Sequence, residues 1–287
     1  MSGPLAVARP LARRLKLRWT RLRRSGMAQD GASPGAAAGP ALDFHCNLCG
    51  SANRAPLAAL VRETPSCAGC GSNVRFRAIA RLVALEVFGR ECALPDLPRM
   101  RSVRGIGLSD SDTYAFTLAD RLDYTNTYFH MEPRLDIAAD DGERFGNCDF
   151  IVASDVFEHV APPVGRAFAN AHRLLKPGGK LIFTVPFSLD ADTVEHFPDL
   201  HEWRLEEREG RWHLANRAAD GREWVRDDLV FHGGPGTTLE MRLFSQAGLL
   251  REFERAGFAR VRIAAEPHLP FGIHWPEPFS VPLVAYR

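Results

Sequence analysis

The sequence predicts an α/β fold in which helices cover both faces of a mostly parallel, twisted sheet. The first observation is that short apolar strand patterns alternate with amphipathic helix patterns from Arg101 onward. The second is residues 147–186, which are typical of a strand, a loop, an amphipathic helix, a glycine turn and a second strand. The third is a set of acidic and imidazole groups, Asp155, Glu158 and His159, just past the carboxyl end of the first of these strands, where open α/β sheets bind their ligands.

Local signals support each element in turn. In 74–89 the apolar residues recur at spacings of three and four, and Gly89 is a typical helix end. In the turn at 176–179, Pro177 stops a helix and two glycines allow the reversal into the next strand. We expect further helices near 112–121, 163–175 and 240–256. Strands are expected near 101–106, 124–129, 149–154, 180–186, 258–265 and 281–286.

The interval 187–238 does not fit this alternation. It is long and polar, and it contains Trp203, Trp212 and Trp224. Because a structureless loop of this length is improbable in a compact domain, we expect an inserted cap or hairpin over the ligand-binding edge.

The composition excludes several classes of protein. A chain of 287 residues with 45% hydrophobic and 25% charged residues is long enough for one large α/β domain and a small module. No apolar run is long enough for a transmembrane segment. The net charge is +1, but residues 1–29 hold eight Lys or Arg and no acid, so the remainder is mildly acidic. Charge alone therefore does not indicate a general affinity for nucleic acid.

Residues 1–43 are predicted to be a basic, poorly ordered arm and linker, since Ser25 to Pro40 is rich in Ala, Gly, Ser and Pro. A disordered tail or a later start at Met27 is the preferred interpretation of the first residues. Apolar residues at helical spacing among arginines make peripheral contact with an anionic membrane surface through residues 5–24 an alternative, and a transit peptide is a further one. The basic start lacks the apolar stretch of a signal peptide, so we expect a cytoplasmic protein.

Residues 44–72 are predicted to be a zinc ribbon. Two CxxC pairs are seventeen residues apart, and each is followed by glycine. The short gap lets both thiolates of a pair bind one tetrahedral ion, and the glycine permits the tight turn. Disulfides or a redox dithiol are the alternatives, and Cys92 and Cys148 are expected to be ordinary buried thiols. A closed shell of four thiolates has no open position, so we expect structural Zn²⁺. The predicted ligands are Cys46, Cys49, Cys67 and Cys70.

A cofactor pocket is predicted after the first two strands of the 73–287 domain. Small residues follow the first strand and would let a ligand approach the backbone at the start of the next helix. Acids after the later strands are candidates for the ribose hydroxyls and the adenine amino group. The predicted cofactor-binding residues are Gly105, Gly107, Ser109, Glu132, Asp140, Asp141 and Asp155.

The run CDFIVASDVFEHV, followed by AHRLLKPGGKLIFTVPF, resembles class I S-adenosylmethionine-dependent methyltransferases. The segments GIGLSDSDTYA, YTNTYFHMEPRLDIAADD, FHGGPGTTLEMRLFS and FERAGFARVRI are similar to a subgroup with an N-terminal four-cysteine zinc ribbon. The resemblance covers about residues 44–287. It implies a Rossmann-like sheet of seven strands with an inserted cap after strand five, S-adenosylmethionine as donor, and methyl transfer as the activity. The family's usual acid at the glycine loop falls on Gly105, and its ribose-binding acid aligns with Tyr128.

Methyl transfer from a sulfonium depends largely on alignment, exclusion of water and, for a hydroxyl acceptor, a general base. Asp155 lies nearest the strand edge and would line the methyl pocket or contact the cofactor. His159 could act as the general base, with an inward-facing structural role as the alternative, and His232 is expected to face the substrate. The predicted catalytic residues are therefore Asp155, His159 and His232.

The most favoured acceptor is a small molecule or a glycan, methylated on oxygen or nitrogen. A zinc-ribbon RNA methyltransferase is an alternative, because Arg75, Arg77, Arg81 and the basic arm could contact phosphates. A non-catalytic binding protein on the same fold is the third possibility, since the glycine loop lacks its acid.

Overall fold

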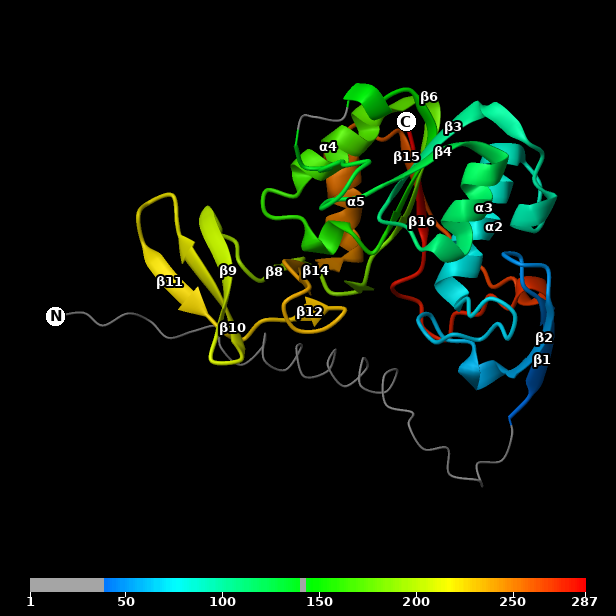
Figure 1. Ribbon diagram of the computed structural model, residues 1–287, viewed down its shortest axis with the longest axis horizontal. Helices are drawn as coiled ribbons and strands as arrows, with labels where there is room; N and C mark the ends of the chain where they lie inside the picture. Colours follow the sequence, from blue (N-terminus) through cyan, green and yellow to red (C-terminus); the bar gives the residue numbers. More distant parts are fainter. Residues whose placement is uncertain (1–38, 140–142) are drawn as a thin grey trace.

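The computed structural model describes residues 39–139 and 143–287. Its centre is a six-stranded sheet with the strand order β15-β16-β6-β5-β3-β4 (Figure 1). β4, β3, β5 and β6 are mutually parallel, whereas β16 is antiparallel to both β6 and β15. The strands are β3 (Met100–Leu108), β4 (Leu122–Thr127), β5 (Cys148–Ser154), β6 (Leu175–Thr184), β15 (Arg260–Ile263) and β16 (Leu283–Tyr286).

Helices cover both faces of this sheet, with α4 and α5 on one face and α2 and α3 on the other (Figure 1). Alternation along β5 explains the two layers, because Ile151 and Ala153 join the core under α4 and α5 while Phe150 and Val152 join the core under α2 and α3. The helices are α2 (Val74–Phe88), α3 (Asp112–Arg121), α4 (Gly165–Leu174) and α5 (Gln246–Arg255).

Side-chain caps explain where three of the helices begin. Asn73 accepts a hydrogen bond from the Phe76 amide at the start of α2, and Ser111 and Ser245 act in the same way at α3 and α5. α2 ends at Gly89, whose φ of 67° lies in the left-handed region that favours glycine. The predicted helix 74–89 and its end signal are confirmed.

The N-terminal part is a small unit on the α2 side of the sheet (Figure 1). The antiparallel strands β1 (Ala41–His45) and β2 (Ala52–Pro56) are joined by the first cysteine turn. The 3₁₀ turn η1 (Leu57–Ala59) and the second cysteine turn then lead into α2. Cys46, Leu48 and Cys67 belong to the same core cluster as Ile79 and Leu82 of α2, so this unit packs directly on the larger domain.

The predicted insertion at 187–238 consists mainly of short strands. A three-stranded antiparallel sheet stands apart from the central sheet, drawn in yellow in Figure 1, and consists of β9 (Glu202–Arg208), β10 (Arg211–Arg217) and β11 (Glu223–Arg226). β7 (Phe187–Ser188) and β8 (Val194–Glu195) flank β14 (Arg242–Ser245), and β12 (Phe231–His232) pairs with β13 (Thr238–Leu239). The remaining 3₁₀ turns are η2 (Leu94–Asp96), η3 (Glu143–Phe145), η4 (Phe157–His159) and η5 (Leu269–Phe271).

The structure corrects several expectations. The resemblance implied seven strands, but the described residues form a six-stranded central sheet, because after β4 the chain makes only an isolated bridge between Tyr128 and Arg134. The helix expected at 240–256 begins later, since residues 242–245 pair with β7 and β8 instead. Pro177 lies within β6, after α4 has already ended at Leu174.

Three predictions fall wholly or partly outside the described residues. Asp140, Asp141 and the basic arm through residue 38 belong to these segments, and their assignments stay predictions. Within the parts of the chain that the structure describes, no helix is both long enough and apolar enough to cross a membrane.

Candidate active site

A cavity of about 720 Å³ lies at the carboxyl ends of the parallel strands. This volume is typical of small-ligand sites. Leu108 and Ser109 line it at the end of β3, Thr127 at the end of β4, and Ser154 and Asp155 at the end of β5. Parallel strands present their carboxyl ends at one edge, which explains why residues distant in the sequence meet here. Other segments complete the wall with Arg62, Arg75, Phe76, Asp136, Ile137, Val160, Trp203, Leu205, His232, Leu239, Met241 and Ser280.

Ser109, one of the predicted cofactor-binding residues, lies on the cavity wall. It has a φ of 56°, which turns the chain sharply between β3 and α3, and its amide donates a hydrogen bond to the Thr127 carbonyl at 2.7 Å. Asp136 lies on the same wall, where Oδ1 accepts a hydrogen bond from the Ala138 amide at 2.9 Å. Asp136 was not predicted, although its position between the apolar residues Leu135 and Ile137 was a signal for a partly buried acid.

Gly105, Gly107 and Glu132 do not line the cavity, so their assignment as cofactor-binding residues stays a prediction. A Cβ on Gly105 would lie 2.3 Å from the Phe150 ring, and one on Gly107 would lie 2.1 Å from Tyr124 Oη. Both glycines therefore make room for aromatic side chains packed on the sheet. The Glu132 side chain is 73% exposed and accepts hydrogen bonds from the Arg134 amide and from Arg144.

Asp110 is a buried acid that the sequence did not single out. Its side chain accepts hydrogen bonds from Tyr114 Oη at 2.8 Å and from Tyr124 Oη, and its backbone pairs with the Asn126 amide group. Burial raises the pKa of Asp110 to about 7, against the opposing effect of these hydroxyls and of Arg75. The Asp110 network fixes the turn that carries Ser109.

The predicted residue Asp155 lies on the cavity wall and is held by two arginines. Arg62 donates to both of its carboxylate oxygens, at 2.6 and 2.8 Å, and Arg75 Nε lies 3.5 Å from Oδ2. The pKa of Asp155 is well below its ordinary value, because the attraction of Arg62 and Arg75 outweighs the opposing effect of burial. A carboxylate held in this way is a poor proton acceptor but a good anchor for the two guanidinium groups.

His159, from η4, and His232, from β12, lie next to each other on the cavity wall although they are far apart in the sequence. His159 Nε2 lies 2.5 Å from His232 Nδ1, and His159 Nδ1 lies 2.9 Å from the Leu239 carbonyl oxygen. Beside them Glu158 is completely buried. Burial raises the pKa of Glu158 well above its ordinary range. The sequence placed Glu158 at the strand edge, but it gave no reason to assign it a role.

Arg242 holds the turn that carries Glu158 and His159. Its side chain is fully buried, and Nη1 donates to the carbonyls of Phe157 at 2.8 Å and Val160 at 2.7 Å. Nε pairs with Glu195 at 2.7 Å, and the Met241 amide donates to the Glu158 carbonyl. Arg242 therefore joins Glu195, within the interval 187–238, to the η4 turn beside the imidazole pair.

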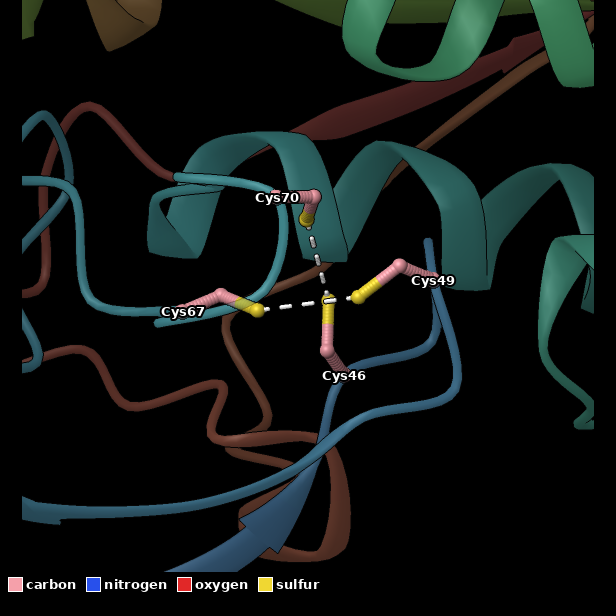
Figure 2. A group of neighbouring side chains, drawn as sticks. All are labelled: Cys46, Cys49, Cys67 and Cys70. Carbon is pink, nitrogen blue, oxygen red and sulfur yellow. Dashed lines mark hydrogen bonds between the residues drawn. The ribbon is translucent and has the colours of Figure 1, made fainter.

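The four predicted cysteine ligands converge on one point (Figure 2). The Sγ atoms of Cys46 and Cys70 are 3.7 Å apart, as are those of Cys49 and Cys67. An ion about 2.3 Å from each sulfur would set the corners of a tetrahedron about 3.8 Å apart. All the cysteines are free thiols, so neither pair forms a disulfide.

Arg77 adds a second observation that fits a metal–thiolate centre. Its side chain is fully buried beside the cluster, and Coulombic attraction from Cys46, Cys67 and Cys70 opposes the effect of burial on its pKa, which is lowered overall. Four thiolates around a divalent ion carry a net negative charge, and a buried guanidinium compensates part of it. The residues present therefore fit Zn²⁺.

The sequence model of the methyltransferase domain family matches residues 68–263. A search of curated proteins finds no match. Among solved structures, CalS10, an amino pentose methyltransferase of Micromonospora echinaspora, is 15% identical with a TM-score of 0.41, over 76% of this chain and 92% of that chain. The Burkholderia thailandensis 1,6-didemethyltoxoflavin-N1-methyltransferase is 16% identical with a TM-score of 0.39, and the match covers 100% of this chain and 93% of that chain. The sugar N-methyltransferase KedS8 of Streptoalloteichus is 14% identical with a TM-score of 0.42, over 91% and 99%.

Proposed function

The chain belongs to the methyltransferase domain family, and we propose that it transfers the methyl group of S-adenosylmethionine to an oxygen or nitrogen atom of a small-molecule or glycan acceptor. The observation that carries the proposal is the cavity at the carboxyl ends of β3, β4 and β5. A sheet of this kind binds nucleotide-like ligands at that edge.

The two sides of the cavity suggest how donor and acceptor share it. We assign the cofactor to the side formed by Ser109, Asp136 and Ile137, because it contains the chain reversal after β3 and an acid near the end of β4. We assign the acceptor to the side formed by His159, His232 and Trp203, which the insertion covers. Asp155 lies between the two sides, where it anchors Arg62 and Arg75 rather than accepting a proton.

The proposed reaction is a direct displacement. The acceptor atom attacks the methyl carbon, the carbon–sulfur bond breaks, and its electron pair stays on sulfur, which leaves as the neutral thioether S-adenosylhomocysteine. The proton of the acceptor group passes to the solvent or to a neighbouring base. What the protein would contribute is mainly alignment and the exclusion of water by the insertion.

A discrete cavity favours a compact acceptor over RNA. The two arginines at the wall, Arg62 and Arg75, are paired with Asp155 and Glu63, so they do not form an unbalanced cationic surface for phosphates. Arg77 is buried and Arg81 pairs with Glu91. Of the arginines considered for RNA contacts in α2, none presents an unpaired charge to solvent.

We further propose that Cys46, Cys49, Cys67 and Cys70 hold a structural Zn²⁺. The spacing of the sulfurs and the buried Arg77 support this assignment. All four positions of a tetrahedral ion would be filled by protein, so the ion would stabilise the turns around it and leave no site for substrate.

The decisive test is calorimetric titration of the purified chain with S-adenosylhomocysteine. We expect binding, and we expect Asp136→Asn to weaken it about tenfold, which corresponds to about 1.4 kcal/mol, because a charged acceptor for the cofactor's hydroxyl or amino groups is lost. Glu132→Gln is the matched control and should leave the affinity unchanged, since this acid points into solvent.

No heat of binding at millimolar S-adenosylhomocysteine would refute the proposed function. If binding occurs but Glu132→Gln is the variant that weakens it, the cofactor lies elsewhere on the sheet edge. Once binding is established, methyl transfer from labelled S-adenosylmethionine to panels of glycans, small molecules and RNA identifies the acceptor class.

A further inference from the structure

Glu158 is a fully buried carboxyl group. Its side chain is 0% exposed, and within the described part of the chain neither carboxylate oxygen has a hydrogen-bond partner. Leaving such a group unsatisfied costs free energy, and a buried carboxylate is normally paired with a cation or bound to a metal. A cationic ligand is therefore the natural complement of this side chain.

Two imidazole nitrogens, a common type of metal ligand, lie near the Glu158 carboxyl group. Oε1 lies 3.7 Å from His159 Nε2 and 3.7 Å from His232 Nδ1, and the two nitrogens are 2.5 Å apart. One carboxylate and two imidazoles from η4 and β12 thus point to the same place. The sequence separation of 73 residues between the histidines means that the fold, not a local turn, brings them together.

The environment of His159 fits a ligand role. A carbonyl oxygen can only accept, so the contact of 2.9 Å to Leu239 places the ring proton on Nδ1. Nε2 then carries the lone pair and faces Glu158 and His232. A ligating imidazole that donates its other N–H to a backbone carbonyl is the common arrangement in metal sites. Arg242, through the Phe157 and Val160 carbonyls, holds the whole turn in place.

We propose that Glu158, His159 and His232 bind a divalent transition-metal ion at the acceptor side of the cavity. A mixed nitrogen and oxygen set of this kind suits Zn²⁺, Co²⁺, Fe²⁺ or Mn²⁺ and differs from the four-thiolate centre. A tetrahedral ion about 2.0–2.1 Å from each ligand atom would draw the carboxylate inward and set the two nitrogens about 3.3 Å apart. Small side-chain rotations would achieve this.

The site keeps coordination positions for a further ligand. Three protein ligands leave at least one position of a tetrahedral ion open. The side chains of His159 and His232 are 11% and 28% exposed, and both line the cavity. This part of the inference rests on the proposed function: an acceptor hydroxyl bound to the ion would have a lowered pKa, so its proton would pass more easily to the solvent before oxygen attacks the methyl carbon.

The test is the zinc content of the purified full-length chain after saturation with Zn²⁺ and removal of free metal. We expect two zinc ions per chain in the natural sequence, and one in His159→Ala and in His232→Ala. His196→Ala is the matched control, because His196 is also a partly buried histidine beside a carboxylate, Glu240, at 3.2 Å. This control should keep both ions.

Co²⁺ loading distinguishes the two sites. The four-thiolate centre gives strong thiolate-to-cobalt charge-transfer absorption, whereas the proposed site should add only weak visible bands that disappear in His232→Ala. Cys70→Ala should remove the charge-transfer absorption and keep the weak bands. Glu158→Gln should also lose the second ion, with S-adenosylhomocysteine binding as the check that it is folded.

A single zinc per chain in the natural sequence, or two in either histidine variant, would overturn the inference. S-adenosylhomocysteine titration separates this result from the proposed function. A chain that binds the nucleotide but holds one zinc is a methyltransferase whose imidazole pair acts without metal. A chain that holds two zinc ions but binds no nucleotide keeps the metal site and loses the proposed reaction.

Discussion

Asp110 illustrates how one buried residue supports the cofactor side of the cavity. It receives hydrogen bonds from two tyrosines while its backbone pairs with Asn126. The turn containing Ser109 therefore depends on a carboxyl group that never touches the cavity. The pKa of Asp110, about 7, also makes the protonation of this network sensitive near neutral pH.

We expect the free energy of unfolding to fall as pH rises through this range. The pKa of Asp110 is raised from 3.8 in the unfolded reference to about 7. Between these two pH values the Asp110 carboxyl group is protonated in the folded state and ionised in the unfolded state. Its contribution to the free energy of unfolding is therefore greatest below about pH 4 and is lost as pH rises towards 7. At about 1.36 kcal/mol per pH unit, the loss is at most about 4 kcal/mol.

Urea unfolding at a series of pH values checks this prediction, with Asp110→Asn as the reference. The amide cannot ionise, so the difference in stability between the two proteins should change with pH in favour of Asp110→Asn as pH rises. A constant difference between the two proteins in the free energy of unfolding from about pH 4 to about pH 8 would show that Asp110 is not the titrating group.

The sequence identified some site residues and not others, for physical reasons. Asp155, His159 and Ser109 follow directly after strands, so the α/β pattern alone placed them on the cavity. The ion-pair partners of Asp155 are Arg62 and Arg75, which lie more than seventy residues earlier in the sequence. No local sequence pattern indicates such a pairing. The depth at which Glu158 is buried likewise depends on packing of the whole molecule.

At the scale of elements, β3 shows why a glycine can matter without lining the cavity. Its Gly105 and Gly107 lie where the sheet carries the Phe150 and Tyr124 rings, which stack with centroids 5.9 Å apart. Glycines in a strand often mark a close approach of this kind. From the sequence alone, these two glycines could not be distinguished from the glycines of a phosphate-binding or cofactor-binding turn.

Gly107→Ala should destabilise the protein by about 1–3 kcal/mol, the usual range for overpacking. The new methyl group would lie 2.1 Å from Tyr124 Oη and 2.4 Å from Asp110 Oδ2, so the buried hydrogen bond between them would have to shift. Thermal unfolding of the variant checks the effect. Gly39→Ala is the control, because its added methyl group meets no atom within 4 Å; equal midpoints in the two variants would contradict the packing role.

Most elements were predictable because their signals are local. The helix at 112–121 has the bounds that the pattern indicated, and all six strands of the central sheet lie near their expected positions. The seventh strand that the resemblance implied is not found among the described residues, where the chain after β4 forms only an isolated bridge between Tyr128 and Arg134. The delayed start of α5 follows from a long-range pairing of β14 with β7 and β8.

At the scale of the molecule, the cysteine unit and the catalytic domain form one cavity wall. Arg62 lies between the cysteine turns in sequence, and it reaches both Asp155 and the Ser280 carbonyl. Breaking a buried pair by removing one partner typically costs about 3–5 kcal/mol. Because Arg62 belongs to residues 57–72, we expect a loss of structure in this segment to weaken ligand binding in the cavity.

We expect Cys70→Ala to weaken S-adenosylhomocysteine binding at least about tenfold, or about 1.4 kcal/mol, although Cys70 does not line the cavity. Loss of one ligand should release the metal and with it the position of Arg62. Titration calorimetry and zinc analysis of the same sample measure both effects. Cys92→Ala is the control, since Cys92 lies outside the cluster; unchanged affinity in a zinc-free Cys70→Ala protein would show that the two units are independent.

The position of β16 has a consequence for biosynthesis. This strand is the last of the six in the sequence, yet it lies inside the sheet and bonds to both β6 and β15. Until Leu283–Tyr286 has left the ribosome, the edges of β6 and β15 that pair with β16 have no hydrogen-bonding partner from that strand. Such edges invite pairing with other chains, so a translation product that stops before Leu283 should accumulate in aggregates rather than as a shortened native protein.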